Sequence, residues 1–176
     1  MNPTWWPICR LWVRLRRHRT PPPNVSDPLW YFAYGSNMNE RLFRERRHMA
    51  PVETRTGRLN GYRLCFAVAG GRRPGISAPA NIVDDPGGVV HGVLYLLSLG
   101  KFFRLDASEG RQYAYLWTEA EDDTGKSVPV VTFRDTGGAP EGRPSLPYMK
   151  IIREAARQRR LPDDYVSFLE RVDTAE

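Results

Sequence analysis

One stretch, residues 30–38, constrains the fold of this chain more than any other; it reads Trp-Tyr-Phe-Ala-Tyr-Gly-Ser-Asn-Met. Its first half is apolar and aromatic and predicts a buried strand. Gly35 permits a sharp bend, and Ser36 and Asn37 are residue types that favour helix N-termini, so residues 39–49 are predicted to form a helix. Backbone N–H groups at such a turn favour a carboxylate, a phosphate or a developing oxyanion. The alternative is that the turn is only a structural corner.

The position of the charges limits the classes of partner. Residues 1–28 hold five arginines against one aspartate, whereas the other 148 residues hold 21 basic and 19 acidic groups. The part that folds is therefore nearly balanced in charge, and we expect no nucleic-acid partner. Cys9 and Cys65 are too few for a disulfide framework, which suits a cytoplasmic location. The three histidines have no ligand-like spacing, so we predict no metal site.

Residues 1–28 interleave tryptophans with arginines and end near three consecutive prolines. This composition predicts an N-terminal extension, followed by a single domain at residues 29–176. No apolar run in the extension could span a bilayer, and the order of charges does not suit a secretory signal. Two alternatives remain: a disordered tail (or a start assigned upstream of the true one), or a short amphipathic helix on an anionic membrane. We favour the disordered tail over membrane contact.

The chain then reads as extended segments separated by turns. The segments predicted to be extended are residues 52–59, 62–68, 76–84 and 89–97, with turns at Asn60-Gly61 and at residues 85–88. The glycine-rich loop 69–75 is either a mobile connection or a lid over a ligand. His91 lies in the apolar segment 89–97, and we interpret it as a packed side chain with no catalytic role.

A second informative stretch, Leu-Asp-Ala-Ser-Glu-Gly at residues 105–110, closes a helix that Ser98 is predicted to cap. Asp106 and Glu109 stand three apart and would share a helix face, and Gly110 is predicted to end the helix as a C′ glycine. A carboxylate at the end of a buried helix is partly desolvated and close to the negative end of the helix dipole. Both effects help a glutamate to act as general base. The alternative is that both acids are solvated or cap backbone groups.

The last third of the chain predicts a hairpin and two helices. The hairpin strands are residues 113–119 and 128–133, followed by a loop at residues 134–147. Apolar residues recur with helical spacing from Pro147 to Arg159 and again over residues 165–172.

Four motifs in this order resemble the gamma-glutamylcyclotransferase family. They are Tyr-Phe-Ala-Tyr-Gly-Ser-Asn at 31–37, Val-Val-His-Gly-Val-Leu-Tyr at 89–95, the stretch 105–110, and Pro-Ser-Leu-Pro-Tyr-Met-Lys-Ile-Ile at 144–152. The resemblance covers residues 29–172. It implies an α+β fold, a small mixed β-barrel with flanking helices and an active cavity at one end.

The resemblance also implies a site. Glu109 matches the family's catalytic glutamate, and Tyr34, Gly35, Ser36 and Asn37 match the turn that binds the γ-glutamyl group. Tyr148 matches another family tyrosine, whereas Phe133 stands where a substrate-contacting tyrosine is expected. The loop after Glu109 is shorter than in the family: tyrosines follow at four and six residues, Tyr113 and Tyr115, instead of at seven.

The activity implied is a lyase- or transferase-type cyclisation, as in glutathione metabolism. The substrate's α-amine attacks its own γ-carbonyl and releases 5-oxoproline with a free amino acid or amine, without metal or cofactor. The partner is then a small γ-glutamyl compound: a dipeptide, an amine or a protected biosynthetic intermediate. The rival hypothesis is a binding module that keeps the cavity but has lost catalysis. The sequence leaves a monomer and a homodimer equally open.

Overall fold

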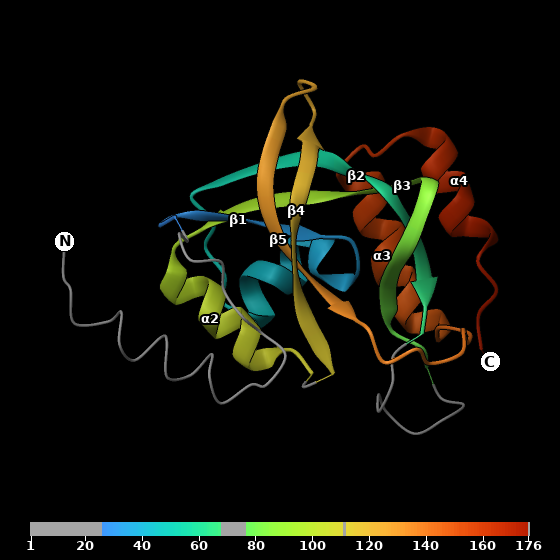
Figure 1. The fold of residues 1–176 in the computed structure, drawn as a ribbon. Helices are drawn as coiled ribbons and strands as arrows, with labels where there is room; N and C mark the ends of the chain where they lie inside the picture. Colours follow the sequence, from blue (N-terminus) through green and yellow to red (C-terminus); the bar gives the residue numbers. More distant parts are fainter. Residues whose placement is uncertain (1–25, 68–76, 111, 176) are drawn as a thin grey trace.

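The computed structural model describes residues 26–67, 77–110 and 112–175. These residues form a closed barrel with the strand order β1–β3–β2–β4–β5, flanked by helices as predicted (Figure 1). The strands are β1 (Leu29–Ala33), β2 (Glu53–Phe66), β3 (Ala80–Leu97), β4 (Tyr113–Asp122) and β5 (Ser127–Asp135); the helical segments are η1 (Ser36–Met38), η2 (Leu42–Arg46), α2 (Leu99–Ser108), α3 (Leu146–Gln158) and α4 (Asp163–Arg171). The predictions for residues 1–25 and for the loop 69–75 lie outside the described residues.

The barrel is mixed because one seam is parallel. β1 pairs antiparallel with β3 and parallel with β5, where Trp30 faces Val130 and Tyr31 faces Val131. The other neighbouring strands are antiparallel. β1 is apolar and almost wholly buried, as its sequence predicts, and its C-terminal end delivers the chain directly into η1.

The prediction of two hairpin-like turns in the first half of the barrel is wrong. Asn60-Gly61 and residues 85–88 do not reverse the chain but lie inside the long strands β2 and β3. The two turn signals face each other: the register shifts between Asn60, opposite Val89, and Tyr62, opposite Asp84. Gly61 takes the left-handed conformation, with φ of 85°. The paired irregularities therefore bend one continuous ribbon, as β-bulges do, instead of ending two strands.

The helix predicted at residues 39–49 is also different. The chain forms a 3₁₀ turn at η1 and a single π-helical segment at η2. Neither Ser36 nor Asn37 is the cap; the Oδ1 of Asn39 accepts from the N–H of Leu42 at 3.0 Å. The physical reason lies in burial, because Met38, Phe43 and Met49 are all buried. Only Phe43 lies within η2, since Met38 belongs to η1 and Met49 follows His48, whose backbone is left-handed with φ of 53°. Three different backbone segments, and not one regular α-helix, therefore turn these side chains into the core.

α2 begins as predicted, with the Ser98 side chain accepting from the N–H of Lys101. Its end differs, because Gly110 does not take the left-handed conformation of a C′ glycine. Glu109 is the C-cap instead, with extended backbone at ψ of 151°. The backbone thus leaves the helical path one residue earlier than predicted.

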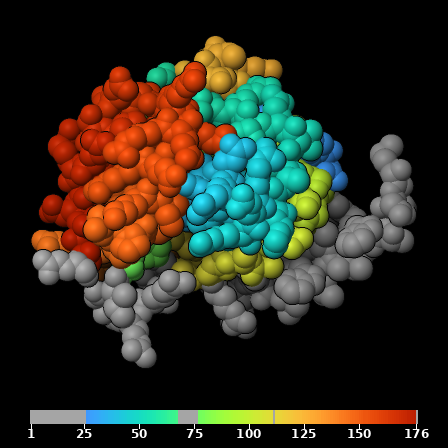
Figure 2. Space-filling view, turned by 180° about the vertical axis from the view of Figure 1, so that it is seen from behind, coloured from blue at the N-terminus to red at the C-terminus, as the bar shows by residue number. Residues whose placement is uncertain are grey.

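The hairpin β4–β5 and the helices α3 and α4 follow the predicted pattern. α3 buries Met149, Ile152, Ala155 and Ala156, and α4 buries Tyr165 and Leu169. α2 lies on one side of the barrel and the α3–α4 pair on the other (Figure 1). Seen from behind, the segment that contains η1 and η2 lies beside α3, on which η1 packs (Figure 2). None of the described helices combines the length and the apolar character that crossing a bilayer requires.

Candidate active site

A small cavity of about 50 Å³, open at its mouth, lies where β1 passes into η1. The structure brings all seven predicted site residues to its wall: Tyr34, Gly35, Ser36, Asn37, Glu109, Phe133 and Tyr148. They come from the turn after β1, from η1, from the end of α2, from β5 and from α3, so closure of the barrel is what gathers them. Their roles stay predictions.

The turn at residues 34–37 is tied to the barrel on both sides. The Tyr34 hydroxyl donates to the carbonyl of Phe133 at 2.6 Å, which joins the end of β1 to β5. A Cβ on Gly35 would lie 3.2 Å from both the Cβ of Ala80 and the hydroxyl of Tyr148. Glycine is therefore required less for its φ than for the close approach of β3 and α3. The Tyr148 hydroxyl also accepts from the N–H of Ala80 at 3.1 Å.

Glu109 meets the turn directly. Its Oε1 accepts from Asn37 Nδ2 at 3.1 Å and lies 3.0 Å from Arg47 Nη1. Asn37 Nδ2 donates to the Tyr31 hydroxyl as well, at 2.9 Å, whereas Asn37 Oδ1 has no hydrogen-bond partner among the described residues. The Glu109 side chain is 14% exposed, so the carboxylate is mostly shielded but open to the cavity. Asp106, which was predicted to share its helix face, is buried and does not line the cavity.

Four tyrosines surround the cavity, and their hydroxyls stay protonated. Burial raises the pKa of Tyr31, Tyr34, Tyr113 and Tyr148 above the usual tyrosine range, and the negative charge of Glu109 raises each of them further. Tyr113 donates to the carbonyl of Ala80 at 3.1 Å. The walls are therefore neutral hydrogen-bonding groups, and the charge is concentrated at one edge of the cavity.

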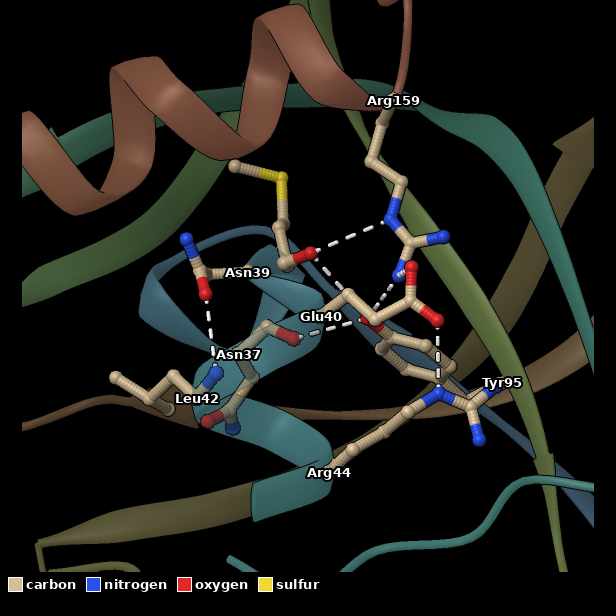
Figure 3. Close-up of polar contacts among 8 residues, drawn as sticks. Asn37, Asn39, Glu40, Leu42, Arg44, Tyr95 and Arg159 are labelled. Carbon is tan, nitrogen blue, oxygen red and sulfur yellow. Dashed lines mark hydrogen bonds and ion pairs between the residues drawn. The ribbon is translucent and has the colours of Figure 1, made fainter. Parts of the chain in front are cut away.

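A polar cluster that includes Tyr95 and Arg159 supports η1 (Figure 3). The Tyr95 hydroxyl donates to the carbonyls of Asn37 and Met38, at 3.1 and 3.3 Å. Arg159, the C-cap of α3, donates to Tyr95 and to the carbonyl of Met38 and lies 3.4 Å from Glu40. Arginine next to Tyr95 lowers the pKa of this hydroxyl, but burial dominates and raises it to about 12. These bonds hold the backbone of η1 to β3 and α3.

Sequence reasoning missed four wall residues: Tyr31, Arg47, Ala80 and Tyr113. Tyr31 and Tyr113 are in predicted strands, and the position of Tyr113 four residues after Glu109 was its only signal. Arg47 had none, because it is one of four arginines between positions 41 and 47 and its ion-pair partner Glu109 is far away in sequence. Because the π turn is wider than an α-helical turn, Arg47 is the one of these four arginines that it places against the end of α2.

No three acidic, histidine or cysteine side chains in the described ranges gather closely enough to hold a metal ion. The expectation of metal- and cofactor-free chemistry stays a prediction.

The fold and the site define a small mixed-barrel protein with one carboxylate facing a glycine-containing turn. Residues 89–169 match the model of the AIG2-like family. The gamma-glutamylcyclotransferase of Mus musculus is 31% identical over 86% of this chain and 82% of its own length. The chain therefore belongs to the gamma-glutamylcyclotransferase family of AIG2-like proteins.

Two further relatives agree. The gamma-glutamyl cyclotransferase aclK of Aspergillus oryzae is 30% identical over 82% of this chain, which spans 61% of the length of that relative. A solved structure of a gamma-glutamyl cyclotransferase superposes with a TM-score of 0.76 at 25% identity, covering 84% of this chain and 89% of the other.

Proposed function

We propose that this protein is a γ-glutamyl cyclotransferase that converts a small γ-glutamyl compound into 5-oxoproline and a free amino acid or amine. The observation that carries the proposal is the meeting of the Glu109 carboxylate with the turn at residues 34–37 in one cavity, through the 3.1 Å contact with Asn37. The names of the relatives support the same reaction class.

In this mechanism Glu109 takes a proton from the substrate's α-ammonium, and the freed amine attacks the γ-carbonyl carbon of the same molecule. Turn N–H groups stabilise the tetrahedral oxyanion. Protonated Glu109 passes its proton to the leaving nitrogen as the bond from that nitrogen to carbon breaks. The carboxylate then takes the second proton from the attacking nitrogen and passes it to the released amine. The carboxylate is regenerated, because the leaving amine gains in total the two protons that the attacking amine loses.

The wall has the properties that an intramolecular reaction needs. Nucleophile and electrophile belong to one molecule, so the main task of the protein is to hold the glutamyl chain in a ring-like pose. Neutral tyrosine hydroxyls can orient the chain without competing for the proton.

The test is a panel of γ-glutamyl dipeptides and γ-glutamylamines with 5-oxoproline as the measured product. We expect product from the wild type and a loss of at least about 100-fold with Glu109→Gln, which keeps the shape but removes the base. Glu45→Gln is the matched control, because Glu45 is exposed on η2, and it should keep wild-type rates.

Two outcomes would contradict the proposal. Equal turnover by Glu109→Gln and the wild type would remove Glu109 from its assigned role. Saturable binding of γ-glutamyl compounds without any 5-oxoproline would favour the rival hypothesis of a catalytically inactive binding module.

A further inference from the structure

Arg47 is the second charged side chain of the cavity, and the reaction described above does not use it. It is the C-cap of η2, and its backbone N–H donates to the carbonyl of Leu42 at 3.1 Å. The guanidinium is 22% exposed and has two partners at the end of α2, the hydroxyl of Ser108 and the carboxylate of Glu109. A partly shielded arginine held at the edge of the cavity can donate to a ligand as well.

The charges of the cavity are paired side by side. Among the described residues that line it, Arg47 and Glu109 carry the charges, and their Nη1 and Oε1 atoms are 3.0 Å apart. A γ-glutamyl group carries the complementary pair, an ammonium and a carboxylate on one carbon. Where the ammonium meets Glu109, the carboxylate bonded to the same carbon comes within reach of the adjacent guanidinium.

We propose that Arg47 binds the α-carboxylate of the γ-glutamyl group, and that substrate binding exchanges the Arg47–Glu109 ion pair for two pairs with substrate. This inference rests on the proposed function. It makes the free α-carboxylate a contributor to substrate affinity. It also frees the Glu109 carboxylate from its guanidinium partner in the bound state, so that Oε1 can pair with the substrate's ammonium.

The experiment compares one substrate that has two carboxylates with two substrates that each lack a different one of them. γ-Glutamyl-alanine has both carboxylates, γ-glutamyl-ethylamine lacks the one on the leaving group, and 4-aminobutanoyl-alanine lacks the α-carboxylate and would cyclise to 2-pyrrolidone. Arg47→Met removes the charge but keeps an unbranched apolar stem. Arg46→Met is the matched control, because Arg46 is the exposed neighbour in sequence.

We expect Arg47→Met to lower kcat/KM for both γ-glutamyl compounds by about 10- to 100-fold, mainly through KM, as for lost charge-assisted hydrogen bonds. The change with 4-aminobutanoyl-alanine should stay within about threefold, the range of ordinary surface substitutions. Arg47→Lys should recover part of the loss, and Arg46→Met should match the wild type.

Equal losses on all three substrates would indicate a merely structural role and overturn the inference. A loss confined to γ-glutamyl-alanine would assign Arg47 to the leaving group's carboxylate and overturn it too.

A binding measurement needs no turnover. 5-Oxoproline keeps the α-carboxylate but has no leaving group, so calorimetry should show its Kd raised about 10- to 100-fold by Arg47→Met and unchanged by Arg46→Met. An unchanged Kd in Arg47→Met would overturn the inference. Product formation by the wild type tests the proposed function separately, because it does not depend on which residue binds the carboxylate.

Discussion

Glu109 is held between two donors of different kinds. Asn37 contributes a neutral amide and Arg47 a full charge, at 3.1 and 3.0 Å from the same oxygen, Oε1. Both stabilise the carboxylate in the free protein, and both belong to the segment that follows β1. The tyrosine hydroxyls around them are neutral. Among the described residues that line the cavity, Arg47 is therefore the charged partner of Glu109. A ligand that binds either charged group therefore competes with the Arg47–Glu109 ion pair.

His91 is the residue from which we expect a pH dependence of stability. It is half-buried in β3 and packs on Tyr165, with ring centroids 5.0 Å apart. Burial lowers the pKa of His91, and the positive charge of Arg58 lowers it further, against the opposite effect of Asp164. Because the folded pKa lies below the unfolded one, of about 6.5, the unfolded state binds more protons between these two values. The free energy of unfolding should therefore decrease as pH falls below about 6.5.

Urea denaturation between about pH 5 and pH 8 checks this prediction. His91→Gln should flatten the decrease, because the titrating group is gone. His48→Gln is the control at an exposed position and should keep the wild-type profile. A slope that is identical in the wild type and in His91→Gln would assign the pH dependence to other groups.

At the level of elements, irregular backbone determines which side chains reach the cavity. A regular α-helix at residues 39–49 would rotate Arg47 to another direction, since each π-type hydrogen bond adds a residue to the turn. The extended conformation of Glu109 likewise redirects its carboxylate from the helix surface toward the cavity. In both cases the sequence pattern indicates the type of element but not the local departure from it.

The bend of the β2–β3 ribbon gives a second prediction. Gly61 has φ of 85°, and a Cβ there would meet nothing within 4 Å, so Gly61→Ala should cost only backbone strain. We expect the free energy of unfolding to fall by about 1–2 kcal/mol. Gly87→Ala is the matched control: its Cβ also has open space, but its φ is not positive, and we expect a change within about 0.5 kcal/mol. Equal effects of the two substitutions in urea denaturation would show that Gly61 is not strained.

At the scale of the whole molecule, side chains reinforce the closure of the barrel. Asn81 in β3 is buried and bridges to β5: its Nδ2 donates to the carbonyl of Asp135 and its Oδ1 accepts from the same residue's N–H, both at 2.9 Å. Thr132 adds a bond from its hydroxyl to the carbonyl of Phe32 at 2.7 Å. These bonds brace the cavity, because Phe133 and Ala80, which line it, lie next to them.

Asn81→Ala should therefore destabilise the whole fold. It leaves a buried donor and a buried acceptor of Asp135 without these partners, and we expect a loss of about 2–4 kcal/mol in the free energy of unfolding. Asn60→Ala, at an exposed position on β2, should change it by at most about 0.5 kcal/mol. Urea denaturation of both variants tests this prediction. A loss of less than about 1 kcal/mol in the free energy of unfolding for Asn81→Ala would show that the hydrogen bonds between Asn81 and Asp135 contribute little to stability.

Much of the fold was predictable from local patterns. The apolar run of β1, the Ser98 cap of α2 and the helical spacing in α3 each lie within a few consecutive residues, and all three predictions are confirmed. The turn signals at Asn60-Gly61 and at residues 85–88 do mark points where the backbone bends, although the chain does not reverse there. Whether they reverse the chain depends on what lies opposite, and the pairing of β2 with β3 aligned the two signals so that they form one bend.

The sequence by itself determined most of the elements and, through its motifs, the family and seven of the residues that line the cavity, because propensities and motifs are short-range properties of the chain. Only the tertiary structure decided that Arg47 lies against Glu109 and that Tyr31 and Tyr113 complete the wall. These contacts join residues far apart in sequence. Their geometry follows from strand register, from the π turn at η2 and from closure of the barrel, and no local pattern specifies any of the three.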